Sequence, residues 1–158
     1  MRIGLISDTH GLLRPEVFDA FEGVQRILHA GDVGKPEILT DLESIAPVTA
    51  VIGNTDGFDL RDRLAEVERL ELAGLAVVVV HGHRLGSPRP DTLRAEHPDA
   101  DVIVYGHTHR PLIERDRDGS LVVNPGAAGP RRFDLVPSVG ILELADGRAD
   151  VKLVELGS

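Results

Sequence analysis

The nine residues DVIVYGHTH, from Asp101 to His109, join a short apolar run to two histidines that are separated by one residue. The β-branched residues at 102–104 predict a buried strand, and Gly106 marks its end. Two histidines just beyond a strand end can direct both imidazole rings into one space, as a metal site requires. This stretch therefore predicts a strand that presents two metal ligands.

Four other apolar runs also end in residues of metal-binding type. Asp8-Thr9-His10 follows residues 2–7, Gly31-Asp32 follows 25–30, Gly53-Asn54 follows 48–52, and His81-Gly82 follows 75–80. The loops after parallel strands share one edge of an α/β sheet. We therefore expect the five strand ends to converge on one pocket.

The remaining pattern predicts helices between the strands and hairpins near the C-terminus. Helices are expected from Pro15, with Val17, Phe18 and Phe21 as an apolar face, from Pro36, and over 60–64 and 90–96. Further strands are expected at 67–72, 112–115, 120–124, 139–144 and 151–156. Asp-Gly pairs at 118–119 and 146–147 are hairpin signals, and we interpret the last four strands as one antiparallel meander. The predicted fold is a single α/β domain over residues 1–158, a four-layer sandwich of two mixed sheets flanked by helices.

Composition narrows the function classes. The chain has 158 residues, of which 42% are hydrophobic and 27% charged, as in ordinary globular domains. The net charge of −9 argues against binding to long nucleic acids or to an anionic membrane. The absence of cysteine excludes disulfides and thiolate metal sites. No leader pattern opens the chain, and the longest apolar run, 75–80, is too short to span a bilayer, so we expect a cytoplasmic protein.

The candidate metal ligands comprise two carboxylates, one amide oxygen and four imidazoles: Asp8, His10, Asp32, Asn54, His81, His107 and His109. With one carboxylate shared, this set suits two divalent ions that keep positions for water. The mixture of oxygen and nitrogen without sulfur favours Mn²⁺, Ni²⁺, Fe, Zn²⁺ or Co²⁺ over Ca²⁺, and Mn²⁺ is the ion we expect.

The order and spacing of the five motifs resemble the calcineurin-like metallophosphoesterases, and Asn124-Pro125-Gly126 resembles the small prokaryotic phosphodiesterase branch. The resemblance implies a dinuclear phosphodiesterase that hydrolyses small phosphodiesters or nucleotides by attack of a hydroxide shared by the metals. It also implies a division of ligands, with Asp32 bridging two groups: Asp8, His10 and His109 on one metal, and Asn54, His81 and His107 on the other.

Among the ligands, Asp32, Asn54 and His10 are predicted to be catalytic. Asn54, together with Thr55 and Arg132 outside the ligand set, is predicted to contact the substrate. Many members of the superfamily carry histidine at the position of Thr55, where it helps the leaving group depart. A threonine hydroxyl donates a hydrogen bond but is no acid near neutral pH, so the resemblance leaves the source of that proton open. Arg131 and Arg132 either hold a phosphate of the substrate or form a solvated pair on a surface loop.

Three histidines lie outside the candidate ligand set, and the sequence is compatible with other functions. We expect His29 to pack or bond to the backbone and His97 to be solvated, while His83 is either a partner of the ligands or exposed. Alternative functions are a phosphomonoesterase or nucleotide pyrophosphatase on the same site, or a protein-interaction scaffold, as in the retromer subunit that resembles these enzymes but lacks metal ligands. A homo-oligomer remains open.

Overall fold

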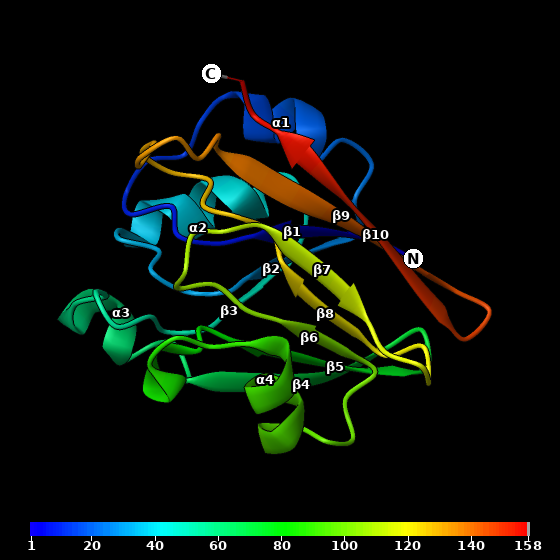
Figure 1. Ribbon diagram of the computed structural model, residues 1–158. Coiled ribbons are helices and arrows are strands. Elements are labelled where there is room, and N and C mark those ends of the chain that lie inside the picture. Colours follow the sequence, from blue (N-terminus) through cyan, green and yellow to red (C-terminus); the bar gives the residue numbers. More distant parts are fainter. Residues whose placement is uncertain (158) are drawn as a thin grey trace.

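The computed structural model describes residues 1–157, and its first sheet is built around the N-terminal strand (Figure 1). The spatial order of its five strands is β10 (Arg148–Glu155), β9 (Ser138–Ala145), β1 (Arg2–Ile6), β2 (Arg26–His29) and β3 (Val48–Ala50). Strands β1, β2 and β3 are parallel, whereas β9 is antiparallel to both β1 and β10. The loops after β1, β2 and β3 therefore leave the sheet at the same edge.

The second sheet also has five strands and a parallel centre. Its spatial order is β4 (Val67–Leu72), β5 (Leu75–Val80), β6 (Val102–Val104), β8 (Leu121–Asn124) and β7 (Leu112–Arg115). Strands β5, β6 and β8 are parallel, and the outer strands β4 and β7 are antiparallel to their neighbours.

The two sheets pack face to face because their central strands are apolar on both sides. In β1, Ile3 and Leu5 belong to the core between the sheets, whereas Ile6 belongs to the core beneath the helices. Gly4 also faces the helices, since a Cβ there would lie 2.9 Å from the ring of Phe21. Strands buried on both faces appear as continuous apolar runs in the sequence, which explains why the central strands were recognisable.

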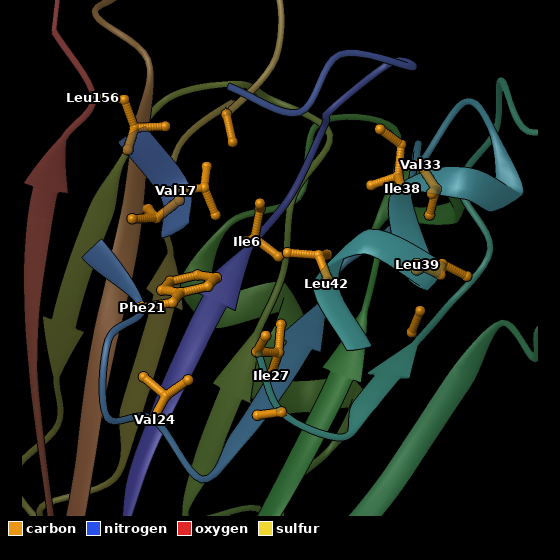
Figure 2. Close-up of a cluster of buried hydrophobic side chains, with 14 of the residues drawn as sticks. Ile6, Val17, Phe21, Val24, Ile27, Val33, Ile38, Leu39, Leu42 and Leu156 are labelled. Carbon is orange, nitrogen blue, oxygen red and sulfur yellow. The ribbon is translucent and has the colours of Figure 1, made fainter. Parts of the chain in front are cut away.

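Helices cover both outer faces and complete four layers. On the first sheet lie α1 (Glu16–Ala20) and α2 (Pro36–Glu43). Figure 2 shows their buried side chains, and that of Phe21 directly after α1, around β1 and β2: Val17, Phe21, Ile38, Leu39 and Leu42. On the second sheet, α4 (Pro90–Glu96) packs through Leu93 against Val78, Ile103 and Val122. Two short elements, α3 (Phe58–Arg61) and the 3₁₀ turn η1 (His83–Leu85), follow β3 and β5. The predicted α/β sandwich of two mixed sheets is confirmed.

Two local predictions are wrong. The last four strands do not form a meander: β7 and β8 join the second sheet, whereas β9 and β10 return to β1 in the first. An Asp-Gly turn specifies only the partner across the turn, so it says nothing about the sheet that a hairpin joins. Phe18 is 42% exposed, because the five-residue helix α1 turns only Val17 and the following Phe21 towards the core. None of the described helices is long and apolar enough to cross a membrane.

Candidate metal centre

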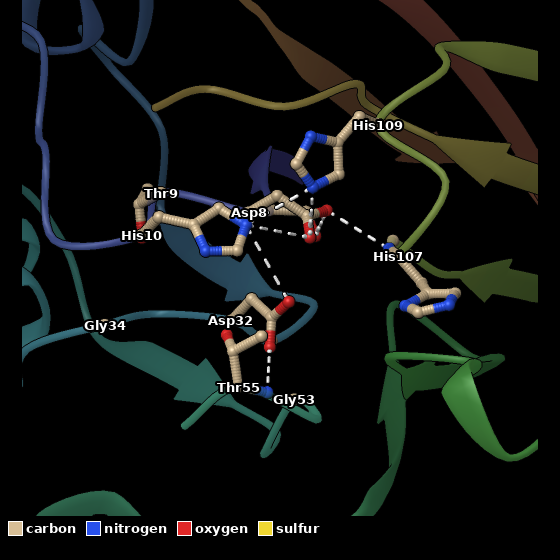
Figure 3. Close-up of polar contacts among 12 residues, drawn as sticks. Asp8, Thr9, His10, Asp32, Gly34, Gly53, Thr55, His107 and His109 are labelled. Carbon is tan, nitrogen blue, oxygen red and sulfur yellow. Dashed lines mark hydrogen bonds and ion pairs between the residues drawn. The ribbon is translucent and has the colours of Figure 1, made fainter. Parts of the chain in front are cut away.

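Loops from both sheets meet at the carboxyl ends of β1, β2, β3, β5 and β6. Figure 3 shows the rings of His10 and His109 directed towards the carboxylate of Asp8. The Nε2 atom of His109 lies 3.3 Å from Asp8 Oδ1 and 3.2 Å from His10 Nε2, and His10 Nε2 lies 3.8 Å from the same Asp8 oxygen. These three residues thus form a first group with potential ligand atoms within 4.8 Å of one another.

A second group surrounds His81. Its Nε2 atom lies 3.2 Å from Asp32 Oδ2 and 3.9 Å from Asp8 Oδ1, and all three potential ligand atoms lie within 4.8 Å of one another. The amide oxygen of Asn54 is 3.1 Å from His81 Nε2 and 3.2 Å from His107 Nδ1. Asp32 Oδ2 is also 3.7 Å from His10 Nε2, so the two groups are adjacent. The structure therefore brings all seven candidate ligands together.

The unpaired oxygen of Asp8 tests whether these residues fit a metal. Its Oδ2 atom accepts hydrogen bonds from Ser7 Oγ at 2.7 Å and from the His107 backbone N–H at 3.2 Å. Its Oδ1 atom is buried and has no hydrogen-bond partner within residues 1–157, although three imidazoles stand around it. A buried carboxylate oxygen without a partner is costly. Carboxylate, imidazole and amide donors around such an oxygen fit divalent transition metals.

The backbone at the site is held in an unusual conformation. Positive φ angles occur at five candidate ligands: Asp8 (54°), His10 (46°), Asp32 (54°), His107 (72°) and His109 (65°). Residues with a Cβ rarely adopt this conformation, which costs about 1–2 kcal/mol at each position. Such strain gathers at functional sites, where the surrounding structure enforces it.

Glycines let these loops approach one another closely. A Cβ on Gly53 would collide with the Asp32 carboxylate and backbone N, and one on Gly106 would collide with Ser7 Oγ. A Cβ on Gly31 would lie 2.8 Å from His81 Nδ1, the atom that also stands 2.8 Å from the Ala30 carbonyl oxygen. The Gly31-Asp32 and Gly53-Asn54 pairs are therefore close-packing devices rather than plain turns.

A buried carboxylate, Asp56, ties two of the loops together. It accepts backbone N–H groups from Gly53 at 2.9 Å, Gly34 at 2.9 Å and Val33 at 3.3 Å. The loop after β3 is thereby fixed to the loop after β2, which carries Asp32. Asp56 was not among the predicted site residues, although its place in the stretch Gly53-Asn54-Thr55-Asp56 was the available signal.

His29 is buried beneath the same loops and is neutral. Its Nδ1 accepts the Gly31 N–H at 3.1 Å, so its Nε2–H donates to Thr9 Oγ1 at 3.0 Å, and that hydroxyl donates to the Val33 carbonyl at 2.8 Å. Burial lowers the pKa of His29 from 6.5 to about 4. The prediction that His29 bonds to the backbone is confirmed, and the chain of bonds links the loops after β1 and β2.

Asn124 supports the loop that carries His107 and His109. Its side-chain N–H₂ donates to the Gly106 carbonyl at 3.2 Å and to Thr108 Oγ1 at 3.1 Å, while its Oδ1 accepts the Gly126 N–H at 2.9 Å. Asn124-Pro125-Gly126 therefore lies directly behind the Gly106–His109 loop.

Charges around the site shift its titrating groups. Burial would raise the pKa of Asp32, but the hydrogen bond and charge of His81 and the Thr55 N–H, 2.9 Å away, outweigh burial and lower that pKa strongly. Burial lowers the pKa of His10; the carboxylates of Asp32 and Asp8 oppose this effect and the charge of Arg132 adds to it. Arg132 is exposed, yet its charge reaches the centre.

Two further histidines, His83 and His97, have defined positions. The ring centroid of His83 lies 5.5 Å from that of His81 and 6.4 Å from that of His107, so His83 stands beside candidate ligands. The prediction that His97 is solvated is wrong: its side chain is buried at the end of α4, and its Nδ1 lies 3.0 Å from Arg69 Nη1.

Comparison with known proteins identifies the family. The sequence profile of the calcineurin-like phosphoesterase superfamily domain matches residues 1–147. The chain belongs to this superfamily. A probable metallophosphoesterase of Methanothermobacter thermautotrophicus is 41% identical over all of this chain and 94% of its own length. Calcineurin-like phosphoesterases use divalent metals, so the family and the two ligand groups agree.

Two solved structures of this calcineurin-like fold are also similar. One is a novel archaeal phosphodiesterase, with 27% identity, a TM-score of 0.75 and coverage of 98% of this chain and 100% of that one. The other is Vps29 of Entamoeba histolytica complexed with Zn²⁺, with 24% identity, a TM-score of 0.78 and coverage of 99% and 100%. The likeness to Vps29 shows the fold alone.

Proposed function

We propose that this superfamily member is a dinuclear metal-dependent phosphodiesterase that hydrolyses small phosphodiesters or nucleotides. The observation that carries the proposal is the pair of adjacent ligand groups, which have Asp8 in common and meet at the carboxylate of Asp32, 3.7 Å from His10 and 3.2 Å from His81. The Oδ1 atom of Asp8 is buried among them without a hydrogen-bond partner in the part of the chain that the structure describes. The similar archaeal phosphodiesterase supports the reaction class. A scaffold function needs no such oxygen buried at a cost in free energy.

The protein's own residues have distinct proposed roles. Bound divalent ions supply activation of water at neutral pH and neutralise charge on the phosphoryl oxygens. The first ion is assigned to Asp8, His10 and His109, the second to Asn54, His81 and His107, with Asp32 between them. The Thr55 N–H and Asp56 hold Asp32 and the Gly53 loop in place. The positive charge of Arg132, which acts on His10, is proposed to attract an anionic ester.

Metal dependence is tested by changing the proposed bridging ligand. In Asp32→Asn we expect activity on bis-p-nitrophenyl phosphate to fall more than about 100-fold, since even outer partners of metal ligands are worth 10- to 100-fold. Metal content per chain, measured by mass spectrometry after loading with Mn²⁺, should fall at both positions. Asp41→Asn, which removes an exposed carboxylate on α2, is the matched control. Wild-type turnover with unchanged metal content in Asp32→Asn would refute the assignment.

The choice of ion and substrate is settled by one panel. Metal-stripped protein refilled with Mn²⁺, Ni²⁺, Zn²⁺, Co²⁺ or Fe²⁺ is assayed on diesters, monoesters and nucleoside diphosphates. We expect Mn²⁺ with diesters to give the highest kcat/KM. A preference for monoesters or pyrophosphate bonds would instead favour the phosphomonoesterase or pyrophosphatase alternative.

Thr55 predicts a strong dependence on the leaving group. Its side chain is exposed beside Asp32 and offers only a neutral hydroxyl, and general-acid help is typically worth about 10²–10⁴-fold. Aryl diesters should therefore react far faster than alkyl diesters, with rates that fall as the leaving-group pKa rises. Thr55→His should flatten this dependence in a leaving-group series. A flat series for the wild type would show that another group supplies the proton.

A further inference from the structure

A hollow of about 490 Å³ opens beside the candidate metal centre. Its lining residues come from the loop after β3, from α3 and its following turn, and from η1: Ile52, Gly53, Asn54, Arg61, Leu64, Glu66 and His83. Asn54 is common to both places, because its amide oxygen also contacts His81 and His107. The hollow therefore begins where the proposed scissile phosphate binds, and its volume is in the range of sites for organic ligands.

The guanidinium of Arg61 is anchored at one nitrogen and unpaired at the other two. Its Nε donates to the Asp56 carbonyl at 3.1 Å, and the Phe58 ring lies 5.9 Å from its central carbon. Within residues 1–157, neither Nη group has a hydrogen-bond or ion-pair partner. A guanidinium fixed in this way keeps a planar fork ready for the oxygens of a phosphate.

His83 provides a second unpaired group on the same wall. Its Nδ1 atom is buried and has no partner among the described residues. A buried polar atom without a partner costs free energy, and a turn of the His83 ring towards the hollow would let a ligand oxygen pair with it and recover that cost. The acidic residue of the lining, Glu66, already pairs with Arg84. The charge of Arg61 is therefore left to dominate the hollow.

We propose that this hollow is a subsite for a second phosphate group of the substrate, held by Arg61 and His83. The inference rests on the proposed function, since the diester that is cleaved lies at the metal centre and the second phosphate lies beyond Asn54. It narrows the substrate class to phosphodiesters that carry a further phosphate. A nucleotide esterified at one phosphate and phosphorylated at another position has this chemistry.

Two chromogenic substrates that differ by one phosphate test the subsite. Thymidine 5′-(p-nitrophenyl phosphate) and its 3′-phosphorylated form both release p-nitrophenol. We expect the wild type to favour the 3′-phosphorylated form in kcat/KM by about tenfold, the effect of one charge-assisted hydrogen bond. Arg61→Gln should bring this ratio near one, whereas Glu66→Gln, which removes the opposing charge, should raise it. Arg63→Gln removes an exposed arginine that does not line the hollow and should leave the ratio unchanged.

The outcomes separate the subsite from the proposed reaction. Equal cleavage of both substrates by the wild type would overturn the subsite and leave the phosphodiesterase standing. If Arg61→Gln lowers both rates alike, the ratio of the two kcat/KM values in Glu66→Gln tests the subsite instead. A higher ratio than in the wild type supports the subsite, and an unchanged or lower ratio overturns it. If neither substrate is cleaved, the phosphodiesterase proposal fails. The subsite is then tested by calorimetric measurement of nucleotide binding to the Mn²⁺-loaded protein. Tighter binding of thymidine 3′,5′-bisphosphate than of thymidine 5′-phosphate, lost in Arg61→Gln, supports it, and equal binding overturns it.

Discussion

Gly53 at the metal-site edge and Gly147 in the β9–β10 hairpin at the far end of the sheets can be compared atom by atom. Gly147 has φ 74° and nothing within 4 Å of an added Cβ, so only its backbone conformation excludes a side chain. Gly53 lies outside the left-handed region, and an added Cβ would collide with Asp32. The hairpin therefore uses glycine for its conformational freedom, whereas the site uses it for space. The two edges should respond differently to the same mutation.

The largest effect is expected at Gly53. In Gly53→Ala the new methyl group must displace the Asp32 carboxylate or its backbone. A displacement of about 1 Å at a reacting centre can cost 100-fold in rate, so we expect at least about that loss of activity together with weaker metal binding. Diesterase assays and metal titration measure both effects. An active Gly53→Ala protein with normal metal affinity would show that the close packing of these loops is dispensable.

The next largest effect is a pH dependence of the free energy of unfolding, which is expected from the metal-site edge and not from the opposite edge. The pKa of His29 is lowered to about 4 in the folded protein, so the unfolded chain binds more protons between pH 4 and 6.5. The resulting stability is complete above pH 6.5 and is lost as the pH falls towards 4, about 3 kcal/mol in all. Urea unfolding of metal-free protein across this range should show a shallower slope for His29→Gln than for the wild type.

The turn between β7 and β8 supplies the control for that experiment. Asp118 is fully exposed, and a hydrogen bond from the Ser120 backbone N–H lowers its pKa. Its contribution is present above the ordinary aspartate pKa of 3.8 and is lost only below it, outside the His29 window. Asp118→Asn should therefore keep the wild-type slope between pH 4 and 6.5. Parallel curves for the wild type and His29→Gln would contradict the assignment of the effect to His29.

The smallest effect is expected at Gly147. Alanine there meets no atom and only bears the positive φ, which costs about 1 kcal/mol. Gly147→Ala should lower the free energy of unfolding by this amount, seen in thermal or urea unfolding, while metal content and turnover stay at wild-type values. A loss of activity in this variant would show that the two edges are coupled through β9.

Strands and turns were predictable because their signals are local. Apolar runs such as Leu75–Val80 identify strands buried on both faces, and Asp118-Gly119 and Asp146-Gly147 identify hairpins. The sheet to which each hairpin belongs was not predictable, because β9 pairs with β1 through contacts almost the whole chain apart, such as Arg2 opposite Glu143. The spacing of apolar residues likewise did not reveal that Phe18 faces solvent, because a helix of five residues is too short to bury all of them.

The candidate ligands were predictable as a set, but the groups that hold them were not. Motif order pointed to the seven side chains that the structure gathers, and their roles remain predictions. Asp56, His29 and Asn124 act through backbone groups of other loops, and such bonds depend on the folded chain path rather than on residue type. Similarly, the burial of His97 follows from its place at the C-terminal end of α4 beside Arg69, a contact that the polar local sequence does not indicate.

The pairing of β1 with β9 has a consequence for synthesis of the protein. The ribosome delivers Asp8 and His10 long before His109, which comes 99 positions after His10, and the β9 partner of β1 comes later still. Contacts of such long sequence separation form late in folding. We therefore expect the nascent chain to expose its candidate ligands Asp8 and His10 before the site exists, and the proposed metal centre to form only after translation has passed β9.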